Sequence, residues 1–149
     1  MNIYEELQHI FFTNIEQYCH GIYKEKAYFH SLQVCALCQK LAIQNNLDIE
    51  IAAIMGLFHD YSQFINHSSF QHAIRSKELL IPILKQTSLS LEKQKIILYA
   101  IEHHSDKENE HDIYSELLKD ADVLAQYLQE PDRIFKKSYL KRLKKYLPR

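Results

Sequence analysis

Apolar residues recur at intervals of three and four along almost the whole chain, which is the spacing of one face of an α-helix. Only two glycines and three prolines interrupt this pattern, and a β-rich fold would need more such turn residues. The pattern therefore predicts an all-α bundle of six or seven helices. Their expected ranges are residues 3–18, 28–45, 49–59, 70–80, 91–103, 113–128 and 132–147, with a polar connector at 61–69 and a helix end near Pro82.

The length of 149 residues suits one domain with a sizeable hydrophobic core. No shift in composition marks a boundary, so we expect a single domain over residues 1–149. The segment 49–59 is apolar almost all round and should be the central buried helix. The motifs described below fall within residues 28–130, and a basic C-terminal helix follows at 131–149.

The charge of the chain is unevenly distributed. Its net charge is −1, but residues 131–149 carry eight Lys or Arg side chains and one acidic side chain. A basic tail can bind nucleic acid or an anionic membrane. A solvated amphipathic helix is the favoured interpretation, nucleic acid is not the expected partner, and docking on the bundle or a homodimer contact is left open.

The three cysteines, Cys19, Cys35 and Cys38, are an odd number in a chain without a secretory signal. This usage predicts reduced thiols and a cytoplasmic location. Cys35 and Cys38 form a C-x-x-C sequence within an apolar helical stripe, so we interpret them as small core residues. No apolar run is long enough to span a membrane.

Histidines and aspartates gather at the ends of the predicted helices or on their apolar faces. Neutral imidazoles and carboxylates are the ligands that suit Zn, Fe, Mn, Co or Ni. Helix bundles build metal sites from such side chains on facing helices. The sequence therefore predicts a metal site formed from members of one set: His30, His59, Asp60, His72, His103, His104, Asp120 and Asp122.

The segments "HSLQV", "AAIMGLFHDYSQF", "HAIRSKELL", "AIEHHS" and "LLKDADVLAQYL", in this order, resemble the HD-domain metal-dependent phosphohydrolase superfamily. The resemblance implies an all-α fold and a minimal ligand set of His30, His59, Asp60 and one later aspartate. Asp120 and Asp122 are two residues apart and point about 200° away from each other on a helix, so both cannot face one metal. The A-D-x-L pattern of the superfamily implies Asp122, with Asp120 orienting the site or facing solvent.

The resemblance also extends to branches of the superfamily that bind two metals. These branches add a histidine at the start of the next helix and another in an A-I-x-x-H segment, here His72 and His104. The implied centre holds one or two divalent transition metal ions (Fe, Mn, Co, Ni or Zn), with Asp60 bridging if there are two. The alternative is a single metal, with His72 and the histidine pair binding phosphate.

The implied activity is hydrolysis of a phosphate ester or anhydride by metal-activated water. The expected substrate is a small phosphorylated molecule, most simply a nucleotide such as a dinucleoside polyphosphate or a nucleoside monophosphate. Asp60 and His103 are the predicted catalytic groups, His103 as proton donor, and the predicted substrate-binding cations are Arg75, Lys77 and Lys119. The alternatives are a diiron oxygenase of the same fold and a nucleotide sensor without catalytic activity.

Overall fold

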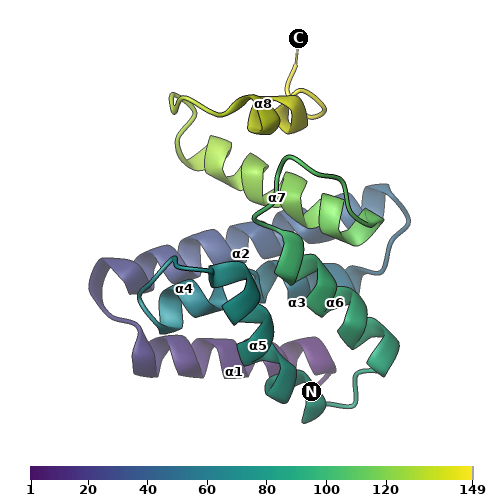
Figure 1. Cartoon of the computed structure of the whole chain (residues 1–149). Coiled ribbons are helices and arrows are strands. Elements are labelled where there is room, and N and C mark those ends of the chain that lie inside the picture. Colours follow the sequence, from purple (N-terminus) through teal and green to yellow (C-terminus); the bar gives the residue numbers. More distant parts are fainter. Residues whose placement is uncertain (149) are drawn as a thin grey trace.

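A computed structural model describes residues 1–148, which form eight α-helices and no β-strand (Figure 1). This confirms the all-α class. The helices are α1 (Ile3–Tyr18), α2 (Gly21–Gln44), α3 (Ile49–Phe58), α4 (Tyr61–Ile65), α5 (His72–Lys85), α6 (Leu91–His103), α7 (Ile113–Gln129) and α8 (Lys137–Leu143).

Helix α2 begins at Gly21, seven residues earlier than predicted. Gly21 has a φ of 60°, a left-handed conformation that glycine adopts without strain, and it lets the chain reverse after α1. The added turns are polar, so the apolar pattern of the sequence does not predict them as helix. They are tied to α1 through Glu16, which accepts hydrogen bonds from Lys24 (2.6 Å) and Tyr28 (2.8 Å).

Two further predictions of helix boundaries were wrong. The connector at 61–69 contains α4, whose Tyr61 and Phe64 are buried although their neighbours are polar. Helix α5 continues through Pro82 to Lys85. Pro82 lies on the exposed side of that helix, while Leu80 and Leu84 are fully buried on the other side. Their burial offsets the hydrogen bond that proline cannot donate.

Helix α3 is the centre of the core, as predicted, and each residue from Ile51 to Phe58 is buried. It packs against α1, α2, α6 and α7. A Cβ atom at Gly56 would lie 2.8 Å from the Cα of Cys35, so only glycine lets α2 and α3 approach this closely. All three cysteines are free and buried, in agreement with their prediction as core residues.

Helix α8 packs on α7, at the end of the molecule opposite α1 (Figure 1). It is shorter than predicted but is docked rather than solvated all round. Its buried Arg142 donates hydrogen bonds to Asp120 of α7 (2.9 Å) and to the carbonyl oxygen of Lys107 (3.0 Å). Asp120 also accepts a hydrogen bond from Tyr146 (2.6 Å). Among residues 1–148, every helix is too short or too polar to cross a lipid bilayer.

Candidate metal centre

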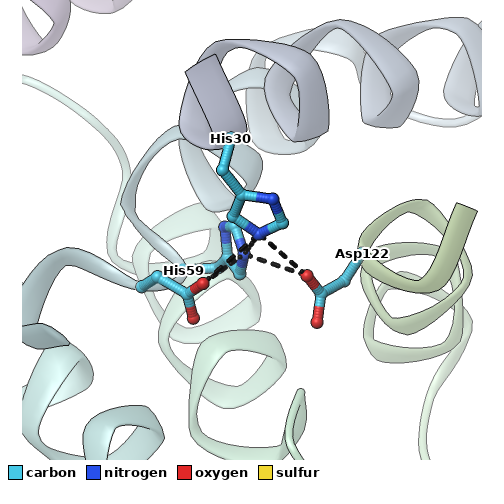
Figure 2. Close-up of side chains that lie close together, drawn as sticks. His30, His59 and Asp122 are labelled. Carbon is cyan, nitrogen blue, oxygen red and sulfur yellow. Dashed lines mark hydrogen bonds and ion pairs between the residues drawn. The ribbon is translucent and has the colours of Figure 1, made fainter. Parts of the chain in front are cut away.

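Three helices bring four of the predicted ligands together. His30 comes from α2, His59 and Asp60 follow the end of α3, and Asp122 comes from α7. The Nε2 atoms of His30 and His59 are 3.2 Å apart, and each lies 3.1–3.3 Å from Oδ1 of Asp122 and Oδ2 of Asp60. Figure 2 shows the two rings and the Asp122 carboxylate pointing toward one common point.

The spacing of these four donor atoms matches that of ligands around one ion. Ligands bound about 2.1 Å from a metal lie about 3.0–3.4 Å from one another in octahedral or tetrahedral geometry. The set of two imidazoles and two carboxylates is almost fully buried, with side-chain exposures of 0–12%. Such a cluster fits a divalent transition metal in both geometry and chemistry.

A second cluster shares Asp60 with the first. Oδ1 of Asp60 lies 3.1 Å from Nε2 of His104 and 3.2 Å from Nε2 of His72. The other oxygen, Oδ2, belongs to the cluster of His30 and His59. Asp60 therefore presents one oxygen to each cluster, as a carboxylate that bridges two ions would.

Backbone carbonyl groups fix the orientation of three of these rings. His59 donates from Nδ1 to Gly56 (2.7 Å), and His104 donates from Nδ1 to Ile101 (2.7 Å). His72 donates in the same way to Ser69 (3.1 Å). A neutral ring that carries its proton on Nδ1 presents a lone pair at Nε2. These lone pairs face carboxylate oxygens, so the arrangement requires a cation between them, either a proton or a metal.

The pKa values of the clustered groups also reflect the need for a cation between the imidazoles and the carboxylates. Burial disfavours charge on His59, but the carboxylates of Asp60 and Asp122 outweigh it and raise the His59 pKa to about 10. Burial likewise disfavours charge on these two carboxyl groups, yet the cations and imidazoles around them hold their pKa values well below the usual range. The pKa of His104 is lowered by burial, which favours the neutral ring that binds metals.

Lys107 is a buried cation at the edge of the first cluster. Its ammonium group donates to Oδ2 of Asp122 at 2.9 Å and to the carbonyl oxygen of His104 at 2.5 Å. The other oxygen of Asp122 faces His30 and His59. Lys107 therefore restricts Asp122 to offering one oxygen to a metal.

The two candidate aspartates of α7 have separate surroundings. Asp122 lies in the donor cluster, whereas Asp120 faces α8 and binds Arg142. Asp120 does not face solvent, because the side chain is 5% exposed, and it contacts none of the clustered histidines directly. Asp120 holds α8 in place.

The clusters open into a cavity of about 370 Å³. Its walls include His30, Asp60, His72, His104 and Asp122, together with side chains that the sequence analysis did not select: Lys26, Gln63, Ser105, Lys107, Gln126, Arg133 and Tyr139. Lys26 precedes His30 by four residues and shares its helix face, but it lies before residue 28, where the predicted helix begins. Lys107 lies in a charged loop that carries no sign of burial, and Arg133 lies in the basic tail.

The structure does not bring the predicted substrate-binding cations to this cavity. Lys77 is paired with Glu102 (2.9 Å), and the guanidinium group of Arg75 lies over the ring of Phe70. Lys119 is fully buried, and it forms an ion pair with Glu116 (2.8 Å) and donates to the carbonyl oxygen of Asn109 (2.8 Å). None of the three lines the cavity.

His103 is also directed away from the cavity. It donates from Nδ1 to the carbonyl oxygen of Tyr99 (2.9 Å), and its ring packs against His111 with centroids 4.3 Å apart. The two histidines of the pair are consecutive on a helix, so they point about 100° apart and only His104 faces Asp60. We therefore do not assign His103 as the proton donor.

Comparisons with known proteins agree with this geometry. The family model of the HD domain matches residues 27–127. Ribonuclease Y from Geobacter sulfurreducens is 30% identical over 122 residues, and that from Geobacter metallireducens is 29% identical over 122 residues. The matched region is 81% of this chain but 22% of each ribonuclease Y, so the chain spans about a fifth of the length of these relatives.

The fold is similar to that of a solved protein as well. The crystal structure of a predicted HD superfamily hydrolase from an uncultured Thermotogales bacterium superimposes with a TM-score of 0.66 at 16% identity. The match covers 97% of this chain and 90% of that one. The family match supports the prediction of a metal-dependent phosphohydrolase. The chain belongs to the HD domain family.

Proposed function

We propose that this chain is a phosphohydrolase with a two-metal centre, acting on a phosphate ester or anhydride of a small molecule such as a nucleotide. The observation that carries the proposal is the shared carboxylate of Asp60, which presents one oxygen to each of two donor clusters. Two-metal sites that hydrolyse phosphate bonds are built around such bridges.

The proposed assignment divides six side chains between two ions. His30, His59, Asp60 and Asp122 would hold the first, and Asp60, His72 and His104 would hold the second. Ions bound there would supply positive charge for phosphoryl oxygens and acidity for coordinated water. The donor types suit Fe, Mn, Co, Ni or Zn, and the smaller number of protein donors in the second cluster leaves more positions for water and substrate.

The remaining residues of the cavity prepare it for an anionic ligand. Lys107 cancels the charge of one of the two carboxylates, which reduces repulsion of a phosphate group. The hydroxyl of Ser105 lies 3.3 Å from Nε2 of His72 and lines the cavity, where it can donate to a phosphoryl oxygen. A cavity of about 370 Å³ is within the usual size range for a small ligand such as a mononucleotide.

The first test is the metal content of protein purified without a histidine tag or chelator, measured by plasma mass spectrometry. We expect about two ions per chain, and a loss of metal and of phosphatase activity in the His59→Ala and Asp60→Ala variants. The exposed His9 offers a matched control, because His9→Ala removes a histidine distant from the clusters. Absence of metal after reconstitution would contradict the proposal.

Cleavage of RNA is a second candidate activity, because the relatives named ribonuclease Y match 81% of this chain. A short single-stranded RNA therefore belongs in the same activity panel as nucleoside monophosphates and dinucleoside polyphosphates. Oxygen uptake in place of phosphate release would indicate an oxygenase. Nucleotide binding without turnover by the metal-loaded protein would indicate a sensor.

A further inference from the structure

The outer part of the cavity contains cations that no carboxylate balances. Three cationic side chains line it: Lys26, Lys107 and Arg133. Lys107 is paired with Asp122 at 2.9 Å. Within residues 1–148, neither Lys26 nor Arg133 forms an ion pair with an acidic side chain. These two cations are therefore available to an anion that enters the cavity.

Both cations are exposed residues of the cavity wall, whereas the donor clusters are almost fully buried. Lys26 precedes His30 by four residues on α2, so it lies on the same helix face about 5–6 Å away. On α7, Gln126 follows Asp122 by four residues, and its side-chain oxygen accepts a hydrogen bond from Arg133 at 3.4 Å. Lys26 is thus about one helical turn from His30, and Arg133 contacts a side chain that is about one helical turn from Asp122.

The position of Arg133 is supported by its surroundings. Its guanidinium carbon lies 5.7 Å from the centre of the Phe135 ring, and its backbone closes a turn by donating to Glu130 at 3.1 Å. A guanidinium group held in this way presents a planar set of donors that matches the oxygens of a phosphate group.

Both residues also lie just outside the part of the chain that matches the HD domain, residues 27–127. Lys26 directly precedes this range, and Arg133 follows it in the segment that connects α7 to α8. Neither residue therefore belongs to the part of the chain that the family model matches.

We propose that Lys26 and Arg133 bind a second phosphate group of the substrate, about one helical turn from the phosphate group at the donor clusters. The preferred substrate then carries two separated phosphate groups, as a nucleoside bisphosphate or a short oligonucleotide does. This inference rests on the proposed function, since it assumes that the first phosphate binds at the clusters.

The test compares adenosine 5′-monophosphate with adenosine 3′,5′-bisphosphate as ligands of the metal-loaded protein, by isothermal titration calorimetry. We expect the bisphosphate to bind about a hundredfold more tightly, since two charged hydrogen-bond donors each contribute about tenfold. Lys26→Gln and Arg133→Gln should each remove about tenfold of this preference, because each deletes one charged hydrogen-bond donor. Binding of the monophosphate should change less than twofold. A dinucleotide of RNA, measured in parallel, distinguishes a nucleic-acid phosphate from that of a free nucleotide.

Lys40→Gln is the matched control. Lys40 is an exposed lysine on α2, about 21 Å along the helix from Lys26, and it does not line the cavity. Equal affinity of the wild-type protein for the two nucleotides would overturn the inference, as would the same loss for both nucleotides in each variant. Metal content and hydrolysis of p-nitrophenyl phosphate report on the proposed function separately, so a failure of either idea can be recognised on its own.

Discussion

Replacing Asp120 by alanine should destabilise the protein without removing metal, because Asp120 holds α8 against α7. The carboxylate is 5% exposed and accepts hydrogen bonds from Arg142 (2.9 Å), Lys145 (3.0 Å) and Tyr146 (2.6 Å). Its removal leaves a buried guanidinium group with fewer partners. Arg142 keeps its contacts with Glu116 and the Lys107 carbonyl group, which limits the damage.

The size of the effect follows from these contacts. A hydrogen bond to a charged group contributes about 1.5–3 kcal/mol, and Asp120 accepts a buried one from Arg142 and a partly buried one from Tyr146. Lys145 is half exposed, so its ion pair adds about 0–1 kcal/mol. Alanine also removes the cost of burying a carboxylate, which offsets part of this loss of stability. We expect a net loss of about 3 kcal/mol, or a fall of about 9 °C in melting temperature for a chain of this size.

Urea denaturation followed by circular dichroism measures this loss. Asp132→Ala is the control, since it removes an exposed acidic side chain from the segment between α7 and α8. A double-mutant cycle with Arg142→Met isolates the interaction energy between Asp120 and Arg142. A coupling energy above about 1 kcal/mol is expected. A destabilisation below about 1 kcal/mol, or loss of metal in the folded Asp120→Ala variant, would refute the role given to this aspartate.

Three other perturbations test the fold and the site. Gly56→Ala places a Cβ atom 2.8 Å from Cys35 Cα and should cost about 1–3 kcal/mol, measured as a lower urea midpoint. Asp48 caps α3, and its carboxylate accepts a hydrogen bond from Lys93 at 2.9 Å. Burial opposes the charge of this carboxylate, but the Lys93 ammonium group holds the Asp48 pKa below its usual value. Its stabilisation is therefore present above about pH 4 and lost as the pH falls through the folded pKa. Asp48→Asn should cost about 0.5 kcal/mol at pH 7, in unfolding titrations against wild type, and the difference should shrink as the pH falls below about 4. Lys107→Met, which frees a carboxylate oxygen, should weaken metal retention at least about tenfold in a chelator competition. Unchanged retention would show that Lys107 does not position its carboxylate.

Helical periodicity was enough to predict the fold class and the central position of α3, because each depends on local patterns of apolar residues. It failed where tertiary contacts decide the structure. The first turns of α2 are polar and are held by Glu16 of α1, and α4 buries two aromatic side chains within a polar segment. Pro82 predicts a helix end, but the burial of Leu80 and Leu84 stabilises α5 beyond this proline.

The candidate site also has a part that the sequence predicts and a part that it does not. The six His and Asp residues that the structure clusters had a signal in the sequence, because metal ligands must be histidine or carboxylate and each sits at a helix end or on an apolar helix. The surrounding cations had no comparable signal. Lys119 and Arg75 are near the clustered residues in sequence but point elsewhere, and Arg133 reaches the cavity from a segment that appeared to be a solvated tail.

Lys107 shows why this difference matters for substrate binding. With the imidazoles neutral, as metal ligands are, the carboxylates of Asp60 and Asp122 give the two clusters a charge of −2, which opposes the binding of a phosphate dianion. Lys107 reduces this charge to −1, and it does so from within the protein, where it is 6% exposed and little screened by salt. Two divalent ions would then bring the centre to +3, whereas a single ion would give +1. A bound phosphate dianion leaves a net charge of +1 in the first case and −1 in the second. Only with both clusters filled does the site, with its buried lysine, compensate the whole charge of a phosphate substrate.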